Sequence, residues 1–182
     1  VSFYAFEMLY WCGIREGKLL ALTPADFDFD RETVTISKSY QRIGGRDIIT
    51  DPKTPKSNRT IKMPEFLCEG MQDYMKQLYR IGKNDRLFEV TKSYLHHEMD
   101  RDANAAGVKH IRIHDLRHSH ISLLIEMGYS AVAIADRVGR ESINITYNYA
   151  HLFPSTQSDM ADKLNQFRKE GTDNVTEEQR RA

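Results

Sequence analysis

Apolar positions at the start of the chain recur at helical spacing and stop at a glycine. The repeat is formed by Phe3, Phe6, Leu9 and Tyr10. Gly13 follows, and glycine is the residue type that most often ends a helix. The pattern predicts an opening helix that ends just before Gly13. Because the sequence starts inside this helix without an initiator Met, we expect it to be an excised part of a longer chain.

Short β-branched segments come next. Residues 33–39, 46–50 and 59–63 have the composition of strands, and turn-rich segments containing Gly, Asp, Pro and Asn separate them. Three sequential strands joined by short turns predict a small antiparallel meander.

Helical periodicity returns after the strands. Helices are expected at residues 65–80, 92–105, 115–127, 131–138 and 142–150. Gly128 and Gly139 are candidates for ending two of them, while Ser130 and Ser142 are candidates for capping the next ones.

A last helix and a tail complete the chain. Thr156 to Asp159 resembles a capping box, and the helix that it opens carries Met160, Leu164 and Phe167. From Glu170 the sequence is polar and is expected to be disordered. The whole pattern predicts an α+β fold, mainly helical with a small three-stranded antiparallel sheet, over residues 1–168, and a tail over residues 169–182.

Composition excludes several classes of protein. With 182 residues the chain is long enough to bury a core without disulfides or metal staples, which excludes a mini-protein scaffold. Its apolar runs are far shorter than the roughly 20 residues that a bilayer span needs, so no membrane partner is expected. Cys12 and Cys68 form no CxxC pair, which is typical of a reducing cytoplasm.

Charge is balanced overall but unevenly distributed. Lys and Arg number 26, and so do Asp and Glu. The segment 38–62 nevertheless has a net charge of +5, from seven basic and two acidic residues. The basic residues are Lys38, Arg42, Arg46, Lys53, Lys56, Arg59 and Lys62. This segment is either a solvated hairpin whose lysines prevent aggregation or a surface that contacts DNA phosphates. If the segment contacts DNA phosphates, the residues expected to bind DNA are Lys38, Arg42, Arg46, Lys56 and Arg59.

Six segments, taken together and in this order, resemble the catalytic domain of tyrosine recombinases, the phage integrase family. They are GIREGKLLAL at 13–22, PKT at 52–54, RTI at 59–61, HDLRHSH at 114–120, and VGRESI at 138–143 with YAHL at 149–152. The resemblance extends from residue 1 to about residue 168. It implies the fold of DNA breaking-rejoining enzymes and, in the longer chain, a helical DNA-binding domain before the catalytic one.

The resemblance also implies a catalytic set. Its members are Arg15, Lys53, His114, Arg117, Arg140 and Tyr149. In this family the tyrosine attacks the scissile phosphate and forms a 3′-phosphotyrosyl intermediate. Planar guanidinium groups, here Arg15 and Arg117, suit the nonbridging oxygens. We expect the clustered positive charge to lower the pKa of Tyr149.

Two further roles follow from the same resemblance. Lys53 would protonate the 5′ oxygen that leaves, and His114 would donate to the phosphate or help to remove the phenolic proton.

The sequence departs from the family pattern at two positions. A carboxylate is usual where Lys18 stands, and His or Trp is usual where Arg140 stands. Arg140 can still donate to a phosphate oxygen but cannot act as a base. A DNA-binding module with impaired catalysis therefore stays open as an alternative. A resolvase or type IB topoisomerase-like enzyme and a helical scaffold with a solvated hairpin are the others.

Histidine spacing raises one more alternative. His110, His114 and His118 are four residues apart, with His120 nearby, and helical His residues at this spacing can bind zinc. The HExxH pattern is missing, however, and Arg117 would place positive charge in the site. We therefore expect no metal and no cofactor, and we expect His118 and His120 to pack or hydrogen-bond beside the active face.

The expected role is integration or excision of a phage or mobile element in the bacterial cytoplasm. The expected partners are double-stranded DNA, further copies of the chain in a tetramer on that DNA, and accessory proteins that set direction. The apolar face of the last helix would either pack on its own domain or dock onto a neighbouring copy.

Overall fold

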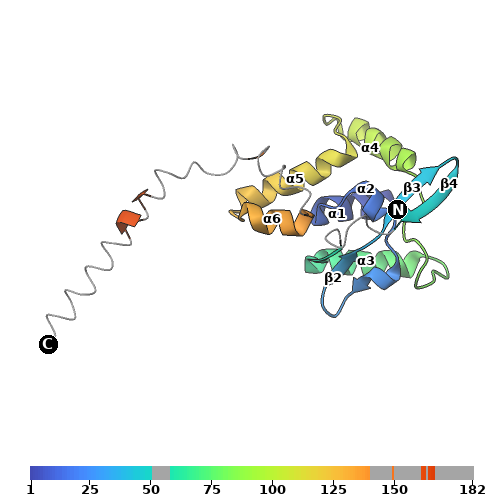
Figure 1. The fold of residues 1–182 in the computed structure, drawn as a ribbon. Coiled ribbons are helices and arrows are strands. Elements are labelled where there is room, and N and C mark those ends of the chain that lie inside the picture. The colour runs from blue at the N-terminus through green and yellow to red at the C-terminus, as the bar shows by residue number, and fades with distance from the viewer. Residues whose placement is uncertain (51–57, 140–148, 150–160, 163, 167–182) are drawn as a thin grey trace.

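One helix occupies the middle of the fold. The computed structural model describes residues 1–50, 58–139, 149, 161, 162 and 164–166. Helix α1 (Ser2–Cys12) packs against both α3 (Glu65–Gln77) and α5 (Ile113–Glu126), which lie on different sides of it (Figure 1). The central position of α1 places its C-terminal end next to α5.

The buried face of α1 includes only part of the apolar repeat. Ala5, Met8, Leu9 and Cys12 are buried, whereas Phe3 is 65% exposed. The smaller side chains let neighbouring helices approach closely, and the Phe3 ring packs edge-on against Tyr4 at the surface instead. The predicted end of the helix is confirmed, because Gly13 adopts the left-handed conformation with φ 60°.

A short connection leads from α1 to the sheet. Helix α2 (Glu16–Leu19) follows, and then a 3-10 turn, η1 (Pro24–Asp26). Asp26 caps this turn, since its Oδ2 accepts from the backbone N–H of Thr23 at 2.8 Å.

The three-stranded antiparallel sheet is present, but the predicted meander is wrong. Its strands are β1 (Phe27–Asp28), β2 (Thr33–Ile36) and β5 (Arg59–Lys62), in the order β1-β2-β5. Val34 is opposite Phe27 on one side and Ile61 on the other. Strands β3 (Ser39–Ile43) and β4 (Arg46–Thr50) form a separate hairpin.

Burial explains why β4 stays out of the main sheet. Val34, Ile36 and Ile61 enter the core, whereas the two apolar residues of β4, Ile48 and Ile49, are adjacent and point to opposite faces of the strand, so neither face of β4 is apolar. Gly44 and Gly45 both have positive φ, which permits the tight turn that pairs Ile43 with Arg46. The predicted strand 33–39 therefore divides between two sheets.

The base of the hairpin is fixed by a charged contact. The hydroxyl of buried Tyr40 donates to Oδ1 of Asp47 at 2.9 Å, and Nη2 of Arg86 donates to Oδ2 at 2.9 Å. The guanidinium of Arg86 also lies 4.4 Å from the centre of the Tyr40 ring. The hairpin is thereby tied to the segment that precedes α4 (Lys92–Ala106).

The later helices agree with the predictions where the structure describes them. Helices α3, α4, α5 and α6 (Ala131–Val138) correspond to the four predicted between residues 65 and 138, although α3 ends at Gln77. Ser130 caps α6, because its Oγ accepts from the N–H of Ala133 at 3.3 Å. Gly139 ends α6 with φ 103°.

The C-terminal region is described only in part. Residues 161, 162 and 164–166 are helical, within the predicted last helix. The predicted helix 142–150, its cap Ser142, residues Met160 and Phe167, and the predicted tail 169–182 lie outside the described residues, apart from Tyr149. The division at residue 168 therefore stays a prediction.

Two apolar clusters hold the helices together. The larger one is formed by buried side chains from α1, the β1-β2-β5 sheet and α3. It includes Cys12 and Cys68, which are both free and buried. The smaller one lies between α5 and α6 and consists of Ile121, Ile125, Ile134 and Val138, with Leu124 and Tyr149 packed against it. None of the helices within the described part has the length and apolar character needed to cross a bilayer.

Candidate active site

Arg117 is the most buried charged side chain of the candidate site. It projects from α5 towards the end of α1, is only 2% exposed, and donates through Nη1 to the carbonyl oxygen of Gly13. Burial, then the nearby charges of Arg15 and Arg59, lower the pKa of Arg117 to about 9, while Tyr149 acts in the opposite direction. A buried cation in these surroundings favours a bound anion.

Arg15 lies near Arg117, two residues after the glycine that ends α1. It is the residue before α2, has extended backbone with φ −76° and ψ 146°, and is exposed. The left-handed Gly13 reverses the chain after α1, which brings Arg15 within electrostatic range of Arg117. The predicted pair of guanidinium groups is therefore brought together by the fold.

Arg59 joins this pair, although the sequence assigned it to the basic segment. It lies on β5 and its Nε donates to the backbone oxygen of Arg137 at 2.9 Å. Burial, and then the charge of Arg15, lower the pKa of Arg59 to about 10. The guanidinium groups of Arg15, which precedes α2, Arg59 of β5 and Arg117 of α5 thus repel one another, and an anion placed among them would relieve that repulsion.

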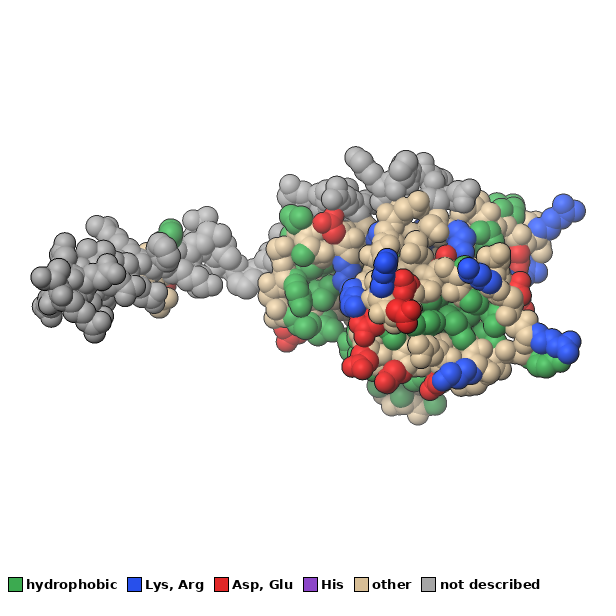
Figure 2. All heavy atoms as spheres, turned by 90° about the horizontal axis from the view of Figure 1, so that it is seen from below, with side chains coloured by type: hydrophobic (Ala, Val, Ile, Leu, Met, Phe, Trp, Pro, Cys, Tyr) green, Lys and Arg blue, Asp and Glu red, His purple; other side chains and the backbone are tan. Residues whose placement is uncertain are grey.

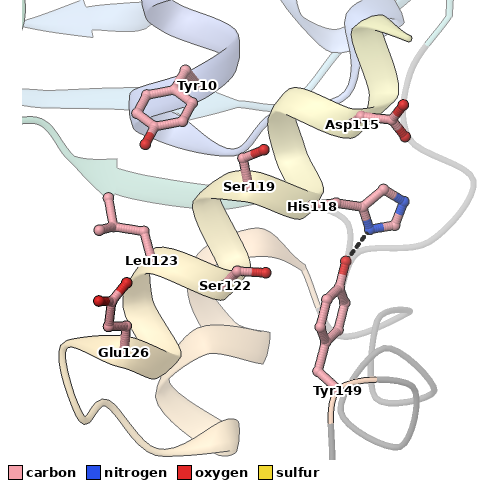
Figure 3. A pocket seen from close by; sticks show the side chains of 8 residues that line it. All are labelled: Tyr10, Asp115, His118, Ser119, Ser122, Leu123, Glu126 and Tyr149. Atoms are coloured by element: carbon pink, nitrogen blue, oxygen red, sulfur yellow. Dashed lines mark hydrogen bonds between the residues drawn. The ribbon is translucent and has the colours of Figure 1, made fainter. Parts of the chain in front are cut away.

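Tyr149 lines a groove along α5 and lies within electrostatic range of Arg117. Its hydroxyl forms a hydrogen bond with Nδ1 of His118, and its ring is packed against the cluster between α5 and α6 (Figure 3). The groove has a volume of about 590 Å³. It is lined by Tyr10, Asp115, His118, Ser119, Ser122, Leu123, Glu126 and Tyr149.

The electrostatic environment of Tyr149 differs from the expectation. Burial, and then the charge of Asp115, raise the pKa of Tyr149, whereas Arg117 lowers it. The expected net lowering by clustered positive charge is wrong, because desolvation of the phenolate and the nearby carboxylate together outweigh the guanidinium. The hydroxyl of Tyr149 is therefore protonated at neutral pH.

Asp115 is a charged neighbour that the sequence analysis did not select. Its Oδ2 accepts from the backbone N–H of Arg112 at 2.9 Å and thereby caps α5. Hydrogen bonds from Arg112 hold the pKa of Asp115 down at about 2, so the carboxylate stays charged beside Tyr149. Asp115 directly follows His114 and opens the predicted helix 115–127, and this position could have indicated that its carboxylate lies near the site.

His114 and His118 form the edge of the site nearest to the start of α5. Their rings are nearly perpendicular, at 85°, with centres 4.7 Å apart. Burial, followed by the charges of His118, Arg117 and Arg15, lowers the pKa of His114. His114 is thus placed with the cations, as its spacing from Arg117 predicted, while His118 contacts the tyrosine.

A second layer of contacts supports Arg117. Arg137 of α6 donates to Nε2 of buried His120 at 3.1 Å, to the oxygen of Lys62 at 3.0 Å and to the oxygen of Trp11 at 3.0 Å. These bonds join α1, β5, α5 and α6 directly behind the guanidinium groups. The sequence predicted a packing or hydrogen-bonding role for His120, and this network is such a role.

Two of the other predicted DNA-binding residues form ion pairs with carboxylates of the chain. Lys38 is bonded to Asp26 at 2.7 Å and to Thr23 at 2.9 Å, and Arg42 lies 3.5 Å from Asp47. Arg46 is exposed at the hairpin turn. Figure 2 shows a face on which Lys and Arg side chains alternate with Asp and Glu instead of forming a continuous basic surface.

Three predicted site residues, Lys53, Lys56 and Arg140, lie outside the described residues.

The four histidines of the zinc alternative do not form one group. His114 and His118 lie together, whereas His120 contacts Arg137. His110 contacts Asp100 at 3.2 Å and Asn104 at 2.9 Å, away from His118. Within the described part, no three His, Cys, Asp or Glu side chains are grouped to hold a metal ion.

The sequence pattern of the phage integrase family matches residues 2–156. The chain belongs to the phage integrase family. A curated relative, the ICEBs1 integrase of Bacillus subtilis (strain 168), is 29% identical to this integrase-family chain over 177 residues. The match covers 90% of this chain and 48% of the relative, so the chain spans about half the length of that protein.

Solved structures of integrases share the fold. The Tn1549 transposon integrase, determined in complex with a circular intermediate DNA, superimposes with a TM-score of 0.75 at 20% identity. That match covers 91% of this chain and 58% of the chain in that structure, which comprises residues 82–397 of the transposon integrase. The catalytic domain of bacteriophage HP1 integrase gives a TM-score of 0.58 at 18% identity, over 87% of this chain and 79% of that domain. The mainly helical fold with small antiparallel sheets is thus that of integrase catalytic domains.

Proposed function

We propose that this integrase-family chain cuts and rejoins double-stranded DNA at specific sites through a covalent link to Tyr149. The observation that carries the proposal is the position of the Tyr149 hydroxyl, which lies within electrostatic range of buried Arg117 and beside the cluster that Arg117 forms with Arg15 and Arg59. A nucleophile next to fixed cations is what phosphodiester cleavage requires.

The chemistry follows from this arrangement. Oη of Tyr149 attacks the scissile phosphorus, the bond to the 5′ oxygen breaks, and a 3′-phosphotyrosyl ester remains. Arg15 and Arg117 donate to the nonbridging oxygens, on which negative charge accumulates in the transition state. Attack by a 5′ hydroxyl from another strand reverses the step and restores a phosphodiester.

Three further roles come from the match to the family pattern. His114 donates to the phosphate from the start of α5, Lys53 protonates the departing 5′ oxygen, and Arg140 supplies another donor to the phosphate. Phosphate contacts by Lys38, Arg42, Arg46, Lys56 and Arg59 complete the proposed DNA surface.

The biological role that we propose is integration or excision of a phage or mobile element. Support comes from similarity to the ICEBs1 integrase and to the Tn1549 transposon integrase, which was solved with DNA. Strand exchange joins four DNA ends, so we propose that a tetramer of the full-length protein acts on DNA with accessory proteins that set direction.

A suicide duplex tests this function. The duplex carries a junction sequence of the element and a nick close to the cleavage site, so the released strand diffuses away and the covalent complex accumulates. We expect an SDS-resistant adduct with the unmodified chain and none with Tyr149→Phe. Tyr79→Phe, at a tyrosine that is 84% exposed, is the matched control and should form the adduct normally.

Mass spectrometry of the trapped peptide assigns the nucleophile. An adduct that persists in Tyr149→Phe would reject Tyr149. Salt-sensitive DNA binding without an adduct in the unmodified chain would identify a catalytically impaired DNA-binding module, for which the departures at Lys18 and Arg140 would be responsible. In that event Lys18→Glu combined with Arg140→His should restore cleavage.

A further inference from the structure

We propose that His118 is the catalytic residue that takes the proton from Tyr149 during cleavage and returns it during rejoining. The inference rests on the proposed function, because it concerns the same nucleophile. From the sequence, His118 was expected only to pack or hydrogen-bond beside the active face.

The contact between the two side chains is direct. Oη of Tyr149 and Nδ1 of His118 share a hydrogen bond, and the ring centres are 5.9 Å apart with planes inclined at 42°. In Figure 3 the hydroxyl end of Tyr149 points at the imidazole of His118, which projects from α5. Within the part of the chain that the structure describes, the nucleophilic oxygen thus has a ring nitrogen as its hydrogen-bond partner.

The positions of two neighbouring histidines, His114 and His118, indicate different roles for them. His114 shares its electrostatic environment with Arg15 and Arg117, which are the proposed phosphate ligands. His118 lies one turn further along α5, stands edge-on to His114, and meets the tyrosine. The imidazole of His114 is therefore available to the phosphate while that of His118 serves the phenol.

The environment of Tyr149 makes a proton acceptor necessary. Burial and Asp115 raise the pKa of Tyr149, so the phenolate is not formed in advance and the proton must leave as the oxygen attacks. Among the described residues, His114, Asp115 and Tyr149 interact with His118, and Tyr10 of α1 and Glu126 of α5 line the same groove. To accept the proton at Nδ1, His118 must be neutral with its proton on Nε2.

The step balances without any additional reactant. As the Oη–P bond forms and the P–O5′ bond breaks, the phenolic proton moves to Nδ1 of His118 and the 5′ oxygen takes a proton from the general acid. The products are the phosphotyrosyl ester, a 5′ hydroxyl and an imidazolium. In rejoining, the imidazolium returns its proton to Oη as the tyrosine leaves.

Two substitutions separate proton transfer from positioning. His118→Asn keeps an oxygen close to the place of Nδ1, so it can still accept a hydrogen bond, but it cannot carry the proton. His118→Ala removes both functions. On the suicide duplex we expect both variants to form the Tyr149 adduct at least about 100-fold more slowly than the unmodified chain. His97→Asn, at an exposed histidine of α4, should react at the normal rate.

A chemical bypass makes the assignment specific. Added imidazole should accelerate adduct formation by His118→Ala but not by His118→Asn, in which the side chain fills the space. A substrate with sulfur in place of the bridging 5′ oxygen needs no protonation of its leaving group, so it should not rescue His118→Ala. Near-normal thermal melting of both variants would show that the rate loss is not a loss of folding.

Each result has a definite meaning. A normal rate in His118→Asn with a slow rate in His118→Ala would overturn proton transfer and leave a positioning role. Rescue of His118→Ala by the sulfur substrate would place the defect at the leaving group and also overturn the proposal. Normal rates in both variants, with the adduct on Tyr149, would reject His118 while sustaining the proposed function. No adduct in the unmodified chain would reject the function itself.

Discussion

The ring of His120 lies directly against Gly13, so a β-carbon on Gly13 would overlap Cδ2 of His120 and approach Cγ1 of Val138 to 3.2 Å. This close approach lets α1 end against α5. It also places the Gly13 carbonyl where Arg117 donates to it. The position of a candidate catalytic guanidinium therefore depends on the absence of a side chain at residue 13.

Gly13→Ala tests this dependence. Alanine at φ 60° is strained by about 1–2 kcal/mol, and the overlap with His120 adds to that cost. We expect the free energy of unfolding to fall by about 2 kcal/mol or more in urea denaturation. Gly44→Ala has a similar φ of 57° with no atom within 4 Å, so it should show the backbone cost alone. Equal losses in the two variants would contradict the role of the overlap.

Arg137→Met removes three hydrogen bonds at once. It leaves the oxygens of Trp11 and Lys62 and the ring of His120 without their donor, in a partly buried region. We expect a loss of about 2–4 kcal/mol in the free energy of unfolding. Arg31→Met, at a side chain that is 83% exposed, should change it little. A loss no larger than that of Arg31→Met would disprove the linking role.

Stability should fall with acidification because of His120. Burial, and then the charges of Arg137 and Arg117, lower the pKa of His120 from 6.5 to about 4. Between those values the unfolded chain binds a proton that the folded chain does not, so its contribution is complete above pH 6.5 and is lost as the pH falls towards 4.

The difference amounts to about 3 kcal/mol over this window. His120→Gln, which cannot titrate, should flatten the curve of unfolding free energy against pH, and His97→Gln should leave it unchanged. A curve of the same shape in His120→Gln would assign the acid sensitivity to other groups. The pKa of Asp115 is held down at about 2, so its stabilising contribution is complete above pH 4 and is lost only as the pH falls from 4 towards 2, outside the window of His120.

Arg117→Lys tests the guanidinium geometry. Lysine keeps the charge but loses the planar fork that serves Gly13 and a phosphate together. We expect adduct formation on the suicide duplex to slow by about 100-fold to 1000-fold, with DNA affinity in a gel-shift assay nearly unchanged. Arg101→Lys on the exposed face of α4 is the control. Equal rates for Arg117→Lys and the unmodified chain would remove Arg117 from the proposed catalytic set.

Asp115→Asn should shift the pH dependence of cleavage. The carboxylate raises the pKa of Tyr149, so its neutralisation should lower that pKa and move the rising limb of the pH–rate profile to lower pH. Asparagine still accepts from the N–H of Arg112, which preserves the cap of α5. Asp102→Asn on α4 should leave the profile in place. A profile unmoved by Asp115→Asn would show that this charge does not act on the nucleophile.

Sequence spacing predicted the parts of the fold that depend on local interactions. The helix end at Gly13 and the cap at Ser130 agree with the structure because a left-handed residue and an N-terminal acceptor act within one turn. The proximity of His114 to Arg117 also follows from helical periodicity. Arg15 joined them in the prediction only through the order of motifs that the chain shares with the phage integrase family.

Interactions between distant segments decided the rest. β4 pairs with β3 instead of entering the main sheet, because its adjacent isoleucines point to opposite faces and leave neither face apolar. Arg59 was predicted to lie on the basic surface segment, but it lies in the cation cluster. A hydrogen bond to the backbone oxygen of Arg137, 78 residues away, holds it there. The sign of the pKa shift at Tyr149 depended on burial and on Asp115, which no spacing could weigh against Arg117. The sequence alone thus determined which chemical groups the chain carries and where the helices that carry them begin and end. Only tertiary packing decided which groups meet and in what dielectric surroundings, because electrostatic and desolvation energies depend on distance and burial rather than on order along the chain.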